Sequence, residues 1–130
     1  MKFCGAQLSY FGATEGAYSH VTENEWEKGQ ITIVEDEGEV DVLINSLGKK
    51  NIPRTPDSWR TTVITISRAG EVKHGSLKIN FPKLNKDELR IYRNQREGFD
   101  FLEGDIWFIF RKRGVLTVGS MPIRKWNRLF

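Results

Sequence analysis

The sequence predicts a mostly β domain, and three observations carry that prediction. Apolar residues recur with a period of two or in short unbroken runs, and no helical periodicity continues beyond about two turns. The runs are rich in β-branched and aromatic residues, as in residues 61–67 and 106–110. Glycine-containing turns separate several of these runs. Eight short segments of strand composition in one chain indicate a barrel or a sandwich.

Taken in chain order, the segments with strand composition are residues 4–11, 30–34, 40–44, 61–67, 77–81, 88–92, 105–111 and 115–120. Turns at Ala69-Gly70-Glu71 and Lys112-Arg113-Gly114 predict hairpins, and Glu37-Gly38 marks a further turn. One or two short helices are expected. Residues 22–28 carry a capping-box pattern, with Thr22 followed by Glu25, and residues 41–47 are helical if the strand assigned at 40–44 is wrong.

Length and composition predict one packed domain spanning residues 1–130, either alone or as a module of a larger protein. A lone cysteine and two histidines exclude an internal disulfide and a conventional structural zinc site. Cys4 is expected to be a buried apolar residue of the first strand. No signal peptide or membrane-spanning run is visible, which favours a soluble protein of a reducing, cytoplasmic setting.

Charge is divided unevenly along the chain. Residues 1–65 hold 6 Lys/Arg against 10 Asp/Glu, a net charge of −4, whereas residues 66–130 hold 14 against 7, a net charge of +7. No acidic residue follows Asp105 in the sequence. Such a distribution suits a polyanion as partner, although a basic surface that only faces water has the same composition.

Residues 88–111 read as two apolar strands joined by a polar connection that bears arginines. Arg90, Arg93 and Arg96 lie three residues apart around it, with Asn94 and Gln95 between the last two. Side chains of these types present forked or paired hydrogen-bonding groups to base edges and phosphates. The connection is therefore a candidate DNA-reading loop, and a plain solvated loop is the alternative.

Three segments resemble one family. Residues 99–110, with Leu102, Gly104 and Asp105 in a turn before an apolar strand, are followed by Val115-Leu-Thr-Val-Gly119. This pattern resembles the end of the DNA-binding pseudobarrel domain shared by plant B-three transcription factors and the effector-binding domains of EcoRII-type restriction endonucleases. Residues 88–94 look like the strand that leads into one DNA-clamping arm of that family. Residues 8–20 are similar to its amino-terminal arm, with Glu15 in place of a glycine and His20 displaced.

The resemblance covers about the last 45 residues best, and it implies an open pseudobarrel of seven to eight strands with one or two short helices. It further implies sequence-specific binding of double-stranded DNA, as the target-recognition module of a prokaryotic restriction endonuclease whose catalytic domain or subunit is separate. Asn94, Gln95 and Arg96 would then read bases, Arg93 and Lys112 would meet phosphates, and Thr14, Ser19 and His20 would contact the DNA from the other arm. Further candidate contacts are Lys49, Lys50, Arg54, Arg124 and Lys125. No catalytic residue, metal or cofactor is expected.

Two alternatives remain open. A small barrel similar to the PUA and EVE groups would read a modified or flipped base in an aromatic pocket, for which Trp59, Trp107 and Tyr92 are candidates. A magnesium-dependent nuclease is suggested by Pro56-Asp57 followed by Glu71-Val-Lys73. Trp59 and Trp107 read more simply as core residues, whereas Trp26 and Trp126 are candidates for exposed rings that stack on bases.

Overall fold

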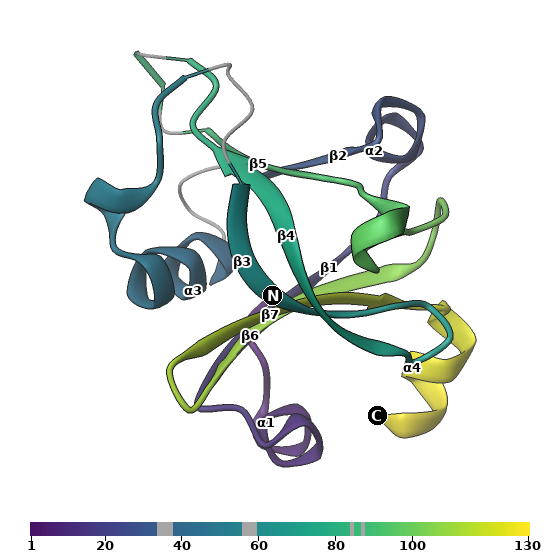
Figure 1. The fold of residues 1–130 in the computed structure, drawn as a ribbon. Coiled ribbons are helices and arrows are strands. Elements are labelled where there is room, and N and C mark those ends of the chain that lie inside the picture. The colour runs from purple at the N-terminus through teal and green to yellow at the C-terminus, as the bar shows by residue number, and fades with distance from the viewer. Residues whose placement is uncertain (34–37, 56–59, 84, 87) are drawn as a thin grey trace.

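The computed structural model describes residues 1–33, 38–55, 60–83, 85–86 and 88–130. Within them a seven-stranded sheet curls into an open half-barrel (Figure 1). Its strands are β1 (Glu15–His20), β2 (Gln30–Ile33), β3 (Arg60–Ile66), β4 (Val72–Asn80), β5 (Leu89–Tyr92), β6 (Ile106–Lys112) and β7 (Val115–Met121). Their spatial order is β1-β6-β7-β3-β4-β5-β2. All neighbouring pairs are antiparallel except β3 and β7, which run parallel.

Four short α-helices accompany the sheet: α1 (Gly5–Phe11), α2 (Glu23–Lys28), α3 (Gly38–Leu47) and α4 (Ile123–Leu129). Two 3-10 turns, η1 (Lys49–Asn51) and η2 (Gln95–Glu97), lie in the connections. The mostly β prediction is confirmed, with more helix than the one or two segments expected. The capping box that predicted α2 is present, since the Thr22 hydroxyl accepts from Glu25 N and the Glu25 carboxylate accepts from Thr22 N. No described helix is long and apolar enough to cross a membrane.

Two segments expected as strands are helices. Residues 5–11 form α1, which ends because Gly12 adopts φ 65° and its N–H caps the carbonyls of Leu8 and Ser9. Cys4 precedes this helix as its N-cap and is exposed, so its expected burial is wrong. Residues 40–44 belong to α3, as the alternative assignment had it, and Val40, Leu43 and Leu47 lie on the helix face that meets the core.

Strand β1 was not expected from the sequence, because Glu15–His20 lacks an apolar alternation. The strand exists through its antiparallel pairing with β6, from Glu15 opposite Arg111 to His20 opposite Ile106. Gly16 is required there, since a Cβ at that position would lie 2.2 Å from the ring of Phe3. Tertiary contacts, not local preference, place these residues in the sheet.

Both faces of the central strands are covered, which explains why β6 reads as an unbroken apolar run. Trp107 and Ile109 enter the main core, which also holds α3, while Phe108 and Phe110 enter a second cluster with Phe3 and Trp126. The core role predicted for Trp107 is confirmed. Trp126 is only 4% exposed, so the expectation that its ring is free to stack on bases is wrong.

The hairpins at 67–71 and 112–115 are confirmed, and β2, β3, β5, β6 and β7 lie within one or two residues of their predicted bounds. The two strands expected within residues 88–111 are present, but they are not neighbours in the sheet. Strand β5 pairs with β2 and β4, whereas β6 pairs with β1 and β7. The connection between them is long because it buries Phe99 and Phe101 completely in the core.

Candidate nucleic-acid interface

The arginine-bearing connection begins with a tightly built turn. The Asn94 Oδ1 accepts from Glu97 N at 3.3 Å, and the Asn94 backbone exchanges two hydrogen bonds with Phe99, at 2.8 and 3.1 Å. Gly98 closes the turn with φ 86°. Because Asn94 uses its side-chain oxygen to cap η2, the exposed groups at the tip are those of Gln95 and Arg96.

This turn is fixed to the β3–β4 hairpin through Glu97. The hydroxyl of the buried Thr65 donates to the Glu97 carbonyl at 2.6 Å, and Ser76 N donates to Glu97 Oε2 at 3.1 Å. Lys73 Nζ donates to the Arg96 carbonyl at 3.3 Å. These bonds hold Arg96 at a defined position and place the Lys73 ammonium beside it. Glu97 is a residue that sequence reasoning missed, since nothing local indicates which strands it will meet.

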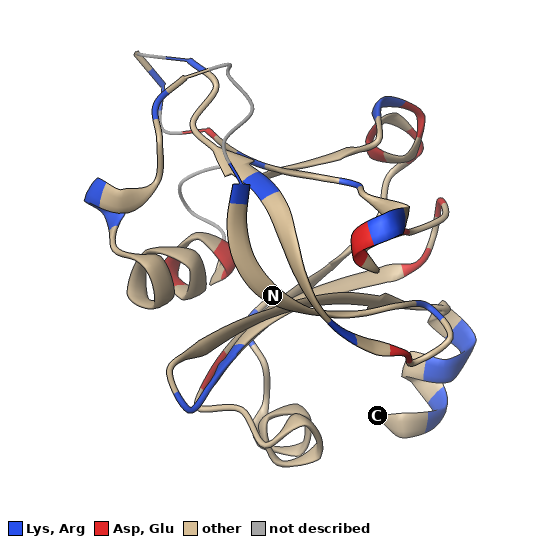
Figure 2. Ribbon diagram, viewed as in Figure 1, with Lys and Arg blue, Asp and Glu red and all other residues tan. Residues whose placement is uncertain are grey.

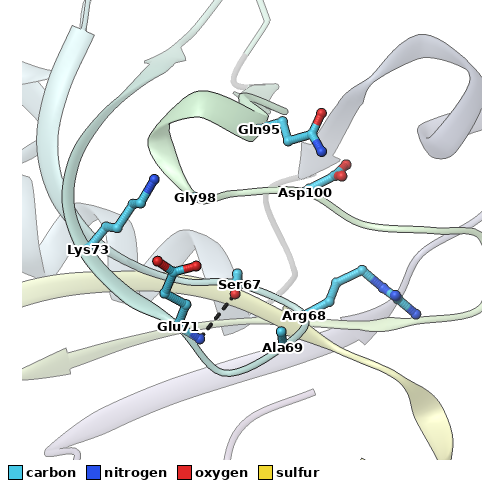
Figure 3. Close-up of a pocket in the computed structure, with 8 residues that line it drawn as sticks. All are labelled: Ser67, Arg68, Ala69, Glu71, Lys73, Gln95, Gly98 and Asp100. Atoms are coloured by element: carbon cyan, nitrogen blue, oxygen red, sulfur yellow. Dashed lines mark hydrogen bonds between the residues drawn. The ribbon is translucent and has the colours of Figure 1, made fainter.

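A cavity of about 380 Å³ lies between η2 and the hairpin tip. Figure 3 shows Gln95 and Asp100 on one wall and Ser67, Ala69 and Glu71 on the other, with Lys73 to one side. Among the described residues, the lining is polar, carries both signs of charge and contains no aromatic ring. These residues therefore offer no stacking surface of the kind that a flipped base would need.

Arg68 is tied to Asp105 at the edge of this cavity. Its Nε and Nη2 donate to the two carboxylate oxygens of Asp105, the second bond measuring 3.0 Å. The hydrogen bond to Asp105, and then the carboxylate charge, raise the pKa of Arg68 above its ordinary value against the opposing effect of burial. The same carboxylate accepts from Leu102 N at 2.9 Å, and Gly104 has φ 83°, so the turn expected at Leu102, Gly104 and Asp105 is confirmed.

Helix α4 meets the same hairpin from its other side. The Lys125 Nζ lies 3.6 Å from where a Cβ on Gly70 would be, and the buried Trp126 anchors the helix to the second aromatic cluster. Figure 2 shows basic residues on α4 and η2 on either side of the β3–β4 tip. We call the surface formed by Lys73, Arg93, Gln95, Arg96, Arg124 and Lys125 the basic end.

Acidic groups limit the basic end. Arg93 Nε lies 3.7 Å from Asp100 Oδ1, and its guanidinium lies 5.8 Å from the Phe101 ring centre. Helix α2 carries several glutamates, and the carbonyl of Gly29, which caps its carboxyl end, accepts from Arg93 N at 2.9 Å. The glutamates of α2 therefore bound the positive surface on one side, and Asp100 and the exposed Glu71 interrupt it along the cavity between η2 and the hairpin tip.

The remaining candidate DNA contacts are not brought together with η2. Thr14 donates to the Arg111 carbonyl at 3.0 Å and lies, like Lys112, near the β6–β7 turn. His20 is at the opposite end of β1, about 20 Å away along the strand. Ser19 donates to Glu39 Oε1 at 2.6 Å. Residues 8–20 thus do not form one loop, because they contain a helix, a turn and an edge strand.

Lys49, Lys50 and Arg54 follow α3 in a separate region. The two lysines are exposed on η1. The Arg54 guanidinium lies 4.2 Å from the centre of the Phe81 ring and donates to the Lys86 carbonyl at 3.2 Å. The Arg54 guanidinium therefore makes its contacts within the domain and is not directed at a DNA surface.

The structure offers little support for the base pocket or for the magnesium nuclease site. Trp107 is 1% exposed and Tyr92 lies under the Lys78 ammonium at 4.4 Å, so neither opens into a base pocket, and Trp59 lies outside the described residues. Asp57 also lies outside them, while Glu71 is exposed at the hairpin turn. In the described part of the chain, no three His, Cys, Asp or Glu side chains gather as metal ligands would.

Comparison with protein-family models, with curated proteins and with solved structures finds no match to this chain. The geometry of the site therefore carries the functional argument alone.

Proposed function

We propose that this chain binds double-stranded DNA in a sequence-specific manner through the basic end. The observation that supports this most directly is the placement of Gln95 and Arg96 at the tip of an anchored turn, with the exposed Lys73 of β4 beside it and Lys125 of α4 across the β3–β4 tip. Forked donors on a rigid turn suit base edges, and the flanking ammonium and guanidinium groups suit phosphates. The half-barrel sheet agrees with a member of the DNA-binding pseudobarrel family.

In this proposal the domain is the target-recognition module of a restriction endonuclease in the cytoplasm of a prokaryote. A catalytic domain or subunit elsewhere cuts the DNA. Arg96 reads a base and Gln95 assists it, while Lys73, Arg124 and Lys125 neutralise phosphates. The sequence suggested a phosphate contact for Lys112. We assign this contact to Lys125 instead, because Lys112 lies beside the β6–β7 turn, away from η2.

Selection from a pool of randomised duplexes, followed by binding measurements on the selected sequence, tests the proposal. Arg96→Gln should cost about 1 to 3 kcal/mol on the selected duplex and relax the preference at one base pair. Lys125→Gln should weaken binding to all duplexes about equally and flatten the salt dependence by roughly one unit. Arg113→Gln, an equivalent change on an exposed arginine of the β6–β7 turn, is the matched control.

Failure to enrich any sequence, with equal losses for Arg96→Gln and Arg113→Gln on every duplex, would refute base reading by η2. A second outcome distinguishes base reading by η2 from recognition of a modified or flipped base in a pocket. If the protein binds a modified duplex much more tightly than the unmodified one, and Arg96→Gln leaves that difference unchanged, recognition lies in another part of the chain.

A further inference from the structure

A second cavity, of about 420 Å³, lies on the other face of the β3–β4 hairpin. Successive side chains of a strand point to opposite faces of a sheet, and Ile64 and Ile66 of β3 line this cavity, whereas the buried Thr65 between them faces η2. Phe110 of β6 and Met121 of β7 complete the floor. We call this cavity the apolar groove.

The walls of the apolar groove leave large apolar side chains in contact with solvent. Tyr10 of α1 is 52% exposed and Val72 of β4 is 63% exposed. The Tyr10 ring is braced edge-on against Phe11 and Phe130, at centre distances of 4.9 and 5.4 Å. The aromatic wall is thus held in place before any ligand arrives, which reduces the entropy that binding would cost.

Two lysines line the same groove. The side chain of Lys112 lies over Gly12, with Nζ 3.2 Å from where a Cβ on that residue would be, and Lys125 Nζ reaches the Gly70 turn. Among the described residues neither ammonium forms an ion pair. Lys125 is half-buried, and a partly desolvated cation interacts more strongly with an anion than one in open water. The groove therefore combines an apolar floor with two lysine ammonium groups that have no ion-pair partner in the described part of the chain.

We propose that the apolar groove binds a small amphipathic organic anion. Its apolar body lies on Ile64, Ile66 and Phe110, and its carboxylate meets Lys125 or Lys112. The cavity volume falls within the range of about 300 to 1,000 Å³ that is usual for small-molecule sites. Strand β7 runs about 13 Å from Thr117 to Met121 along the floor, which suits a chain of medium length. The inference stands on this groove and does not depend on DNA binding.

Titration of the ¹⁵N-labelled protein with hexanoate, octanoate and decanoate, followed by amide NMR shifts, tests the proposal. Shifts should centre on β3 and β7, the strands of the floor. Affinity should rise about two- to fourfold with each added methylene, as burial of alkyl groups requires. Octanoate should bind at least about fivefold more tightly than octanol, because only the carboxylate pairs with lysine.

Variants localise the binding. Val72→Glu places a negative charge at an exposed rim position and should weaken octanoate binding about fivefold or more while the chain still folds. Lys112→Gln combined with Lys125→Gln should abolish the preference for octanoate over octanol. Arg128→Gln, an exposed change on α4 outside the groove, is the matched control and should bind as the wild type does.

Three results would overturn the inference. They are shifts that centre away from β3 and β7, affinity that does not depend on chain length, and equal binding of octanoate and octanol by the wild type. Wild-type affinity for octanoate in the double lysine variant would likewise exclude the proposed charge contact.

Discussion

Gly75 on β4 tests whether the η2 turn is seated on the sheet as the structure describes. A Cβ added at Gly75 would lie 2.7 Å from the Glu97 carbonyl oxygen, 3.1 Å from its Oε2 and 3.3 Å from its Cβ. The nearest atom belongs to the backbone, so no flexible side chain can move away to make room. Gly75→Ala should push η2 outward by about 0.7 Å to reach an ordinary contact of about 3.4 Å.

The displacement has a cost that can be measured. Overpacking of this kind lowers the free energy of unfolding by about 1 to 3 kcal/mol, and part of that loss is the weakened bond from Thr65 to the Glu97 carbonyl. With a urea m-value of about 2 kcal/mol/M, the unfolding midpoint should fall by roughly 1 M. Binding to the selected duplex should lose base discrimination at the position that Arg96 reads.

Gly5→Ala is the matched control for this substitution. No atom lies within 4 Å of a Cβ at Gly5, which begins α1, so the same chemical change should leave the midpoint unchanged or slightly higher. Equal midpoints for Gly75→Ala and Gly5→Ala would refute the reasoning, because they would mean that η2 does not rest on β4.

Three further predictions concern charge and chemistry. Wild-type affinity for duplex DNA should fall with salt at a log–log slope of roughly −3, as expected for the three phosphates assigned to Lys73, Arg124 and Lys125, and a flat response would remove the electrostatic basis of the proposal. Asp105→Asn should lower the free energy of unfolding by about 1 to 3 kcal/mol, because it disrupts the paired bonds to Arg68 and the bond from Leu102 N. Asp41→Asn, which removes an exposed pair with Lys2 and one acidic charge in the first turn of α3, should cost less than about 1 kcal/mol; equal losses in urea melts would argue against a structural role for the Arg68 pair. The domain incubated with Mg²⁺ should leave DNA that contains the selected site intact, and cleavage that Glu71→Ala abolishes would establish the nuclease alternative instead.

Residues next to one another in the sequence determined much of the local structure. The apolar and aromatic runs predicted as strands at residues 61–67, 105–111 and 115–120 form β3, β6 and β7, since such side chains fill either face of a buried sheet. Thr22 with Glu25 specified the start of α2, and Gly104 with Asp105 specified the turn before β6. These features depend on contacts between residues a few positions apart, which is why they could be predicted from the sequence.

Only the tertiary structure decided which segments meet. Strand β1 exists because β6 offers it an edge, and β5 and β6 separate because Phe99 and Phe101 between them are buried in the core. The parallel pairing of β3 with β7 lays the Gly70 turn beside α4, while Thr65 and Glu97 bring η2 to the other face of the same hairpin. The residue types of the basic end are therefore visible in the sequence, whereas its assembly follows from burial and strand pairing between distant segments, which no local pattern encodes.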